Sequence, residues 1–314
     1  MHAKISNIVN PPLAGRYPAS KASVEGEVPS GFAGGGGDAS PYDIKGWIMI
    51  RRPVVAGKFY PSSADELERQ IGGYMTSDAE KRRVIGIVSP HAGYIYSGRV
   101  AGDVYSRIVP ANSFIIMGPN HTGMGLPVSV YADGEWEVPN GIVEVDSSLA
   151  SLIMRRCRFA HDDYSAHLYE HSLEVQIPFI KFLVHDPKIV PIVMMEDDIK
   201  VLKDLGEAVA DAVASSSGTI IIASTDMTHY ESDESVRRKD SMAIRSILDL
   251  DPLGLYEVVR KEGISMCGFA PTVSLLFAAN RLGAKKAELV RYATSAEVSG
   301  DYSHVVGYAG ILIM

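Results

Sequence analysis

Cysteine is scarce in this 314-residue sequence, which has only Cys157 and Cys267. Two cysteines so far apart exclude the disulfide framework that supports small secreted proteins. Such sparse usage is typical of a reducing interior, where a single cysteine is either core filler or a reactive group. We therefore expect a cytoplasmic protein without disulfides.

Long hydrophobic runs are also missing. No apolar run approaches the roughly 20 residues that a membrane-spanning helix needs. The first residues lack the charged and then apolar pattern of a secretory signal. We predict no association with a membrane, which agrees with the cytoplasmic location expected from the cysteine content.

Positive charge is in deficit, because 30 Lys and Arg stand against 38 Asp and Glu, for a net charge of −8. A chain of this charge presents no general basic face, so we predict that nucleic acid is not a partner. Hydrophobic residues make up 46% of the sequence, which is enough for a large core. The composition is that of a globular protein.

Residues 1–48 differ from the rest of the chain. They contain two adjacent prolines, at 11 and 12, and four consecutive glycines, at 34–37, but no apolar periodicity that could form a packed face. This composition predicts a disordered leader. Our hypothesis is that the native chain starts at Met49 and that the leader is an upstream extension. Residues 49–314 are then the folded domain.

Two apolar runs that end in histidine organise the fold prediction. Residues 84–88 lead to His91, and residues 114–117 lead to His121. Short runs of large apolar residues bounded by Pro and Gly indicate strands that are buried on both faces. The helical pattern at 98–108 joins the runs into a βαβ unit, whose strands are normally parallel and end at one edge. Ligands bind at that edge in open α/β sheets, so we expect a shared site.

The alternation of strands and helices continues to the carboxyl terminus. Further helices are predicted at 62–76, 147–156, 170–184, 198–214, 235–248 and 252–262, and residues 265–271 open a last helix that runs through 279. Further strands are predicted at 188–195, 219–225, 287–292 and 305–313, with short antiparallel strands within 126–145. The predicted class is α/β: one domain with a central mixed, mostly parallel sheet flanked by helices.

His91, His121 and Cys267 form a candidate metal site. Imidazole nitrogens and a thiolate suit iron, copper or zinc, whereas calcium and magnesium sites use oxygens. Three protein ligands leave coordination positions open for water or substrate. Cys267 precedes a predicted helix, whose positive end favours the thiolate. The alternative for Cys267 is a buried structural cysteine.

Asp226 and His229 are candidates for the same site, and His171 and Glu174 form a separate candidate pair. Asp226 and His229 follow a buried strand, so His229 is a candidate general acid or base, or an outer partner of the metal. Asp226 is a candidate for orienting an imidazole, donating a ligand oxygen or capping the next turn. His171 and Glu174 share a face of a predicted helix at a spacing that metal-binding helices use, although solvated helix faces carry many such pairs. Four other histidines have no comparable context and are predicted to be surface or structural residues: His161, His167, His185 and His304.

Five motifs follow one another along the chain: PHAGY at 90–94, GPNH at 118–121, EHSLEVQIP at 170–178, STDMTH at 224–229 and Cys267-Gly268. In this order and context they resemble the Memo family, which is protein B of the AmmeMemoRadiSam system. The resemblance runs from about residue 54 to the carboxyl terminus.

The resemblance implies a fold like that of the class III extradiol dioxygenases, whose non-haem iron is held by two histidines and a carboxylate. The metal ligands of the Memo family carry over to His91, His121 and Cys267. Asp226 and His229 carry over as catalytic pocket residues, and His229 resembles the proton-transfer histidine of the dioxygenases. A thiolate in place of a carboxylate favours copper or zinc more strongly and can itself be oxidised, so cleavage of catechol rings is not implied.

The resemblance also implies a function. Eukaryotic relatives are associated with copper-dependent redox chemistry, iron binding and phosphotyrosine peptides, and prokaryotic relatives accompany radical-SAM and AMMECR-like proteins. We expect a metal-dependent oxidoreductase that uses iron or copper on an unknown small molecule or peptide. The alternatives are a zinc-dependent hydrolase and a metal- or peptide-binding module without catalysis. The motifs supply few cations besides Arg99, which disfavours phosphopeptide binding.

Overall fold

The computed structural model describes residues 42–45, 48–216 and 218–314, all within the compact unit Ser40–Met314. Its strands are β1 (Tyr42–Lys45), β2 (Ile48–Arg51), β3 (Gly86–Ser89), β4 (Ser113–Pro119), β5 (Val128–Val130), β6 (Glu135–Val138), β7 (Gly141–Val145), β8 (Ala160–Asp162), β9 (Lys188–Met194), β10 (Thr219–Ser224), β11 (His229–Glu231), β12 (Ala287–Thr294) and β13 (Val305–Ile313).

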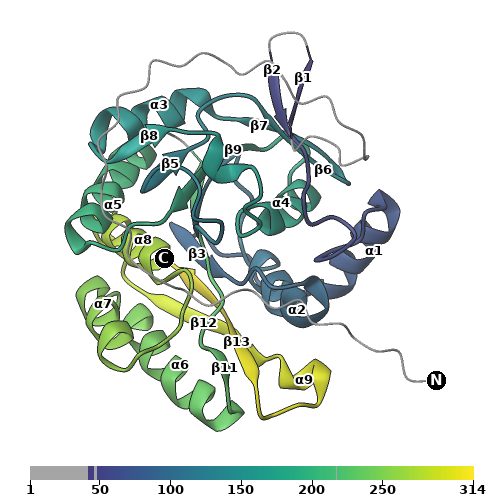
Figure 1. Cartoon of the computed structure of the whole chain (residues 1–314), viewed down its shortest axis with the longest axis vertical. Helices are drawn as coiled ribbons and strands as arrows, with labels where there is room; N and C mark the ends of the chain where they lie inside the picture. Colours follow the sequence, from purple (N-terminus) through teal and green to yellow (C-terminus); the bar gives the residue numbers. More distant parts are fainter. Residues whose placement is uncertain (1–41, 46–47, 217) are drawn as a thin grey trace. The chain divides into compact units, whose positions relative to one another are not determined.

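The helices alternate with these strands along the chain (Figure 1). They are α1 (Ala64–Tyr74), α2 (Tyr94–Tyr105), α3 (Ser147–Arg156), α4 (Ile177–Leu183), α5 (Ile199–Ala214), α6 (Asp233–Leu248), α7 (Pro252–Lys261), α8 (Phe269–Arg281) and α9 (Ala296–Ser299), with 3-10 turns η1 (Ser165–His167) and η2 (Glu174–Gln176). None of the described helices is long and apolar enough to cross a membrane.

The strands form one mixed sheet in the order β1-β2-β6-β7-β9-β4-β10-β3-β13-β11, with β12 beside β13, β5 beside β9 and β8 beside β5. Its central strands β7, β9, β4, β10 and β3 are parallel. The α/β prediction is therefore confirmed. The two strands that precede the histidines are not neighbours, however, because β10 lies between them. Their carboxyl ends still lie at one edge, since both are parallel to β10.

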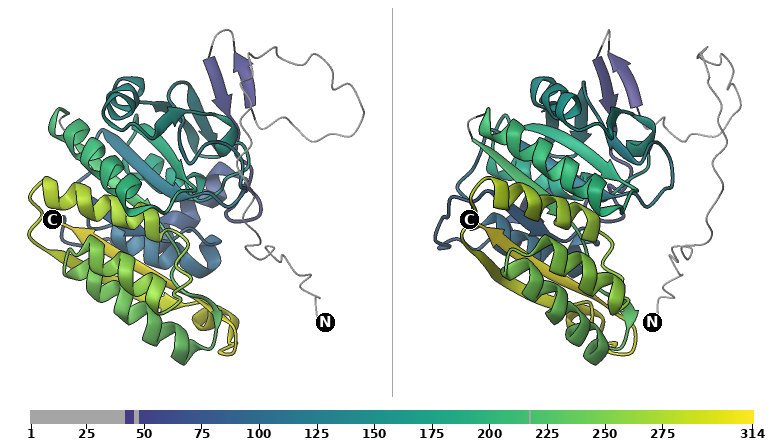
Figure 2. Two further views of the ribbon diagram at one scale, coloured as in Figure 1. Left: turned by 60° about the vertical axis from the view of Figure 1, so that its left-hand side comes forward. Right: turned by 90° about the vertical axis from the view of Figure 1, so that its left-hand side faces the viewer.

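Helices cover both faces of the sheet (Figure 2). Successive residues of β10 point to opposite faces, as in any strand. Ile220 and Ile222 belong to the core that includes residues of α1, α2 and α4. Ile221 and Ala223 belong to the core that includes residues of α3 and α5 to α8. Burial on both faces explains why the β10 sequence is an uninterrupted apolar run.

Glycine lets helix α2 approach strand β13. A Cβ atom on Gly310 would lie only 2.4 Å from Cγ2 of Val104 in α2 and 3.2 Å from the carbonyl oxygen of Val100. Glycine at this position of the strand therefore permits the close approach of the two elements.

One predicted helix begins too early. Residues 170–173 are not helical, and the segment predicted as a helix at 170–184 contains only the short turn η2 and α4. The physical reason is a side chain that competes for backbone donors, because Oε1 of Glu170 accepts hydrogen bonds from the amides of His171 and Ser172.

The predicted leader, residues 1–48, falls mostly outside the described residues. Within them, Tyr42–Lys45 form β1, which pairs antiparallel with β2. The part of the leader that the structure describes therefore contains a strand that extends the sheet.

Candidate metal centre

Four side chains from separate segments meet at the carboxyl edge of the sheet. His91 and His121 follow β3 and β4, His171 lies in the connection before η2, and Cys267 precedes α8. The ligand atoms of the three histidines all lie within 4.8 Å of one another. Sγ of Cys267 lies 3.3 Å from Nε2 of His91. The structure thus brings together the three residues expected to bind a metal and adds His171.

A hydrogen-bond network determines the tautomer of His91. The hydroxyl of Ser224 donates its single proton to the carbonyl of Ser172, at 2.6 Å, and accepts a hydrogen bond from Nε2 of Gln176, at 2.8 Å. Nδ1 of His91 lies 3.0 Å from the same hydroxyl, so this nitrogen must carry the hydrogen and donate it. Nε2 of His91 is therefore the nitrogen that faces Cys267, with the sulfur 3.3 Å away.

Glu170 orients His121 in the same way. Oε1 of Glu170 accepts the hydrogen of Nδ1 of His121 at 2.8 Å, and Oε2 accepts the amide of His121 at 2.5 Å. The loop that carries His121 is folded by Asn120, whose side-chain oxygen accepts the amides of Thr122 and Gly123 at 3.0 and 2.8 Å. Nε2 of His121 therefore faces the cluster, where this side chain is hydrogen-bonded to Cys267.

Cys267 reaches the site because a glycine follows it. A Cβ atom on Gly268 would lie 2.4 Å from the carbonyl oxygen of Ser224, at the end of β10. The amide of Gly268 also donates to Oγ1 of Thr225, at 2.9 Å. The sulfur of Cys267 accepts the amide of Asp226, at 3.3 Å, so a backbone dipole supports negative charge on this atom.

The cluster forms an ion pair at neutral pH. Burial would raise the pKa of Cys267, but the charge of His91 and hydrogen bonds to His121 and His91 lower it to about 6. Burial would likewise lower the pKa of His121, but hydrogen bonds to Cys267 and Glu170 raise it to about 10. The thiol of Cys267 is therefore ionised, and its charge is balanced by an imidazolium.

His171 is the residue of the cluster that sequence reasoning did not assign to the metal. Its ring stacks on that of His121, with the centroids 4.5 Å apart and the planes at 23°, and its other side contacts Phe59. Burial lowers the pKa of His171 to about 3, so its imidazole is neutral. The signal that could have identified it is its position beside Glu170 in a family motif.

Glu174, which was paired with His171 in the predicted helix, has a structural role instead. Its carboxylate forms an ion pair with Arg51, and both side chains are fully buried. It also accepts hydrogen bonds from the hydroxyl of Tyr60, at 2.5 Å, and from the amide of Val55, at 3.0 Å. These contacts connect the chain after β2 to η2 and leave Glu174 outside the cluster.

Asp226 and His229 lie beside the cluster. Asp226 is buried, which raises its pKa, and its Oδ1 accepts the amide of His91 at 2.8 Å. Asp226 therefore holds the turn that carries His91. His229 is partly exposed, and its Nδ1 donates to the carbonyl of Ser265 at 2.9 Å, whereas its Nε2 makes no hydrogen bond within the described residues.

The other histidines of the folded part match their expected surface or structural roles. His161, His185 and His304 are exposed. His167 is fully buried against Tyr131 and Trp136, and its Nε2 donates to the carbonyl of Ser129 at 3.2 Å. Cys157, which the sequence did not link to any site, is buried in the core.

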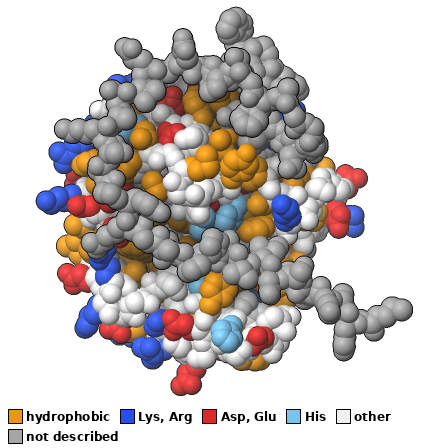
Figure 3. Space-filling view, viewed as in Figure 1, with side chains coloured by type: hydrophobic (Ala, Val, Ile, Leu, Met, Phe, Trp, Pro, Cys, Tyr) orange, Lys and Arg blue, Asp and Glu red, His pale blue; other side chains and the backbone are white. Residues whose placement is uncertain are grey.

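Histidine side chains reach the surface near the middle of one face, beside hydrophobic side chains (Figure 3). The exposed fractions are 27% for the side chain of His121 and 17% for that of His171, so the cluster is open to small molecules.

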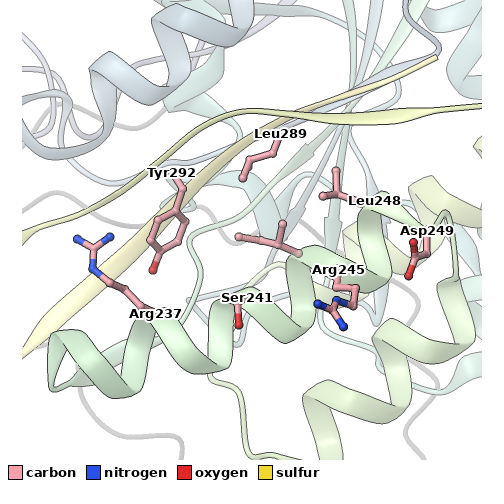
Figure 4. A pocket seen from close by; sticks show the side chains of 8 residues that line it. Arg237, Ser241, Arg245, Leu248, Asp249, Leu289 and Tyr292 are labelled. Carbon is pink, nitrogen blue, oxygen red and sulfur yellow. The ribbon is translucent and has the colours of Figure 1, made fainter.

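A separate groove of about 540 Å³ lies between α6 and β12 and is lined by Arg237, Arg245 and Tyr292, among others (Figure 4). No residue of the cluster lines this groove.

Comparison of this chain with known proteins identifies its family. A family model described as "Memo-like protein" matches residues 51–312. The chain belongs to the Memo family. MEMO1 family proteins from Methanopyrus kandleri and Desulfurococcus amylolyticus are 40% and 45% identical to it over 279 and 277 residues. These alignments cover 84% and 83% of this chain, and 99% and 98% of the relatives.

A third relative agrees with this Memo assignment. A MEMO1 family protein from Thermotoga petrophila is 42% identical over 280 residues, which is 84% of this chain and all of the relative. Among solved structures, an uncharacterized Escherichia coli K12 protein superposes with a TM-score of 0.46 at 10% identity, over 65% of this chain and 87% of that chain. All four residues of the cluster lie within the part of the chain that the Memo model matches.

The donor atoms fit a transition metal. The described ligand atoms are imidazole nitrogens and a thiolate sulfur, which iron, copper and zinc accept and which calcium and magnesium do not prefer. The carboxylate of Glu170 orients the imidazole of His121, as outer partners do in metal sites. The cluster is therefore a candidate metal-binding group of a Memo family protein.

Proposed function

We propose that this Memo family chain is a metal-dependent oxidoreductase of unknown substrate, which holds iron or copper through His91, His121 and Cys267. The observation that carries the proposal is the distance of 3.3 Å between the sulfur of Cys267 and Nε2 of His91, within a cluster that also contains His121. When bound, the metal would supply one-electron chemistry at the open edge of the sheet.

The remaining residues prepare the site. Ser224 and Glu170 hold the rings of His91 and His121 with Nε2 toward the cluster. Asp226 holds the backbone of His91, so we assign it a positioning role in the pocket. His229 is the proposed proton carrier, because its Nδ1 hydrogen is engaged by a carbonyl and its Nε2 remains available.

Metal analysis tests the proposal. Protein expressed with iron or copper available should bind about one metal per chain, as expected for a single first-row metal site. His91→Ala and Cys267→Ser should each remove most of it, because each deletes a donor. His161→Ala is the matched control, since this histidine is exposed and outside the cluster. Full metal retention by both site variants would contradict the assignment.

The role of His229 needs a separate test. His229→Ala should retain the metal and slow oxygen consumption with ascorbate as the electron donor, because proton transfer is lost and the donors remain. Unchanged oxygen consumption in this variant would remove His229 from the mechanism.

The donor set also supports zinc, with hydrolysis as the second candidate function. Imidazoles and a thiolate are common zinc ligands, and zinc activates a bound water by lowering its pKa toward about 7. Elemental analysis of anaerobically purified protein from the native host distinguishes the two functions. Zinc as the sole metal there would overturn the oxidoreductase proposal.

The partners are proposed from family membership. The substrate would be a small molecule or a peptide, and radical-SAM and AMMECR-like proteins would act with this chain. Co-purification from the native host under anaerobic conditions would test the protein partners.

A further inference from the structure

The imidazole of His171 is held by ring contacts and not by a hydrogen bond. Its Nδ1 lies 3.6 Å from Oε1 of Glu170, which is too far for a hydrogen bond. Within the described part of the chain, neither ring nitrogen of His171 makes a hydrogen bond. His91 and His121 each donate Nδ1 to a neighbour, at 3.0 and 2.8 Å. The side chain of His171 is 17% exposed, so its ring nitrogens, which make no hydrogen bond within the described residues, are available to a ligand.

The position of His171 indicates which ligand. Its ligand atom lies within 4.8 Å of those of His91 and His121. Two nitrogens bound to one tetrahedral metal at about 2.0–2.1 Å are about 3.4 Å apart, so a modest ring movement would bring all three imidazoles onto one ion.

The backbone of His171 is placed by the same carboxylate that orients His121. Oε1 of Glu170 accepts Nδ1 of His121 at 2.8 Å and the amide of His171 at 2.9 Å. One buried group therefore sets the separation of two imidazoles, as expected if both serve the same ion.

We propose that His171 is a third imidazole ligand, so that the centre has three nitrogen donors and one sulfur donor. This inference rests on the proposed metal site at His91, His121 and Cys267. With His171 as a ligand, the site would suit some metals better than others for catalysis. Four protein ligands fill the coordination shell of tetrahedral zinc and leave no position for water. An ion with more than four coordination positions would keep room for substrate, which favours the oxidoreductase over the hydrolase.

Cobalt(II) added to the metal-free full chain is the probe. Its visible absorption reports coordination number and donor type, and a sulfur-to-cobalt charge-transfer band reports Cys267 separately. In His171→Ala the visible bands should change and the charge-transfer band should remain. The affinity for cobalt should fall by more than about tenfold. Loss of an outer partner already lowers metal affinity by about tenfold or more, and loss of a direct ligand should cost more. Free imidazole should restore the bands.

The controls separate the two proposals. His161→Ala should match the wild-type chain, and His171→Asn repeats the test should the alanine variant fold poorly. Visible bands and affinity unchanged in both His171 variants, with the charge-transfer band present, would overturn the role of His171 alone. A wild-type chain with no charge-transfer band would overturn the metal site itself.

Discussion

At the candidate metal centre, the carboxylate of Glu170 accepts four hydrogen bonds. Two come from the ring and amide of His121, and two from the amides of His171 and Ser172, at distances of 2.5 to 2.9 Å. Burial would raise the pKa of Glu170, but the hydrogen bond and charge of His121 lower it, so the group is ionised. Because only donors surround this carboxylate, the position requires a group that accepts hydrogen bonds and carries no hydrogen of its own.

Glu170→Gln should weaken the metal site. The amide group has the same shape, but it brings two hydrogens to a position where donors already converge. Metal affinity should fall by about 10- to 100-fold, as for other outer partners of ligating histidines. Titration with zinc measures it, and Glu257→Gln, on the exposed surface of α7, is the control. Equal affinities for both variants would contradict a role for Glu170 at the site.

His167 predicts a pH dependence of stability. Its burial lowers the pKa of the imidazole to about 3, whereas in the unfolded chain it is about 6.5. Below pH 6.5 the unfolded state binds the proton and the folded state does not, so this group lowers stability as the pH falls toward 3.

Replacing His167 should remove that contribution. In His167→Leu the slope of the unfolding free energy against pH, between pH 6 and 4, should be smaller by about 1.4 kcal/mol per pH unit. Urea unfolding of the metal-free protein at several pH values measures the slope. The exposed His161→Leu should leave the slope almost unchanged, and an unchanged slope in His167→Leu would show that His167 is protonated when folded.

At the scale of elements, the site depends on β10 and α8. β10 lies between β3 and β4, so the residues that follow it reach both histidines. α8 begins at Phe269, and the close contact of Gly268 with the end of β10 brings Cys267 to the same edge. The site is therefore assembled by strand order and helix packing.

The contact between α2 and β13 predicts a sensitive position. Gly310→Ala should destabilise the protein by about 1–3 kcal/mol, because the new Cβ atom would overlap Val104. Gly73→Ala is the matched control, since nothing lies within 4 Å of its Cβ position in α1 and alanine favours helix by about 0.5–1 kcal/mol. Urea unfolding measures both. A Gly310→Ala variant as stable as wild type would show that α2 can move away from the sheet.

At the scale of the whole molecule, the candidate ligands come from four segments between residues 91 and 267. Such a set exists only when the chain is folded, so metal binding should be linked to folding. Zinc at about 100 times its dissociation constant should raise the unfolding free energy by about 2.7 kcal/mol. Urea unfolding with and without zinc measures the gain.

The ligand variants make this prediction specific. His91→Ala and Cys267→Ser should each lose most of the gain from zinc, whereas His161→Ala should keep it. An equal gain in all variants would mean that zinc binds elsewhere in the folded chain.

The sequence by itself determined most of the elements. The buried strands were visible as apolar runs because strands covered on both faces need no polar residues, and α3 and β13 have the predicted bounds. The pieces of the candidate site were also visible, because His91, His121 and Cys267 sit beside Pro and Gly at the ends of elements. These are local properties, which neighbouring residues encode.

Only the tertiary structure decided which distant residues meet. It placed β10 between β3 and β4, brought His171 to the cluster, and assigned Glu174 to the buried Arg51. His171 and Glu174 are three residues apart and both belong to one motif, so no local pattern separates their roles. Their partners lie 50 to 123 residues away in the chain, and the packing of helices on the sheet selects those partners.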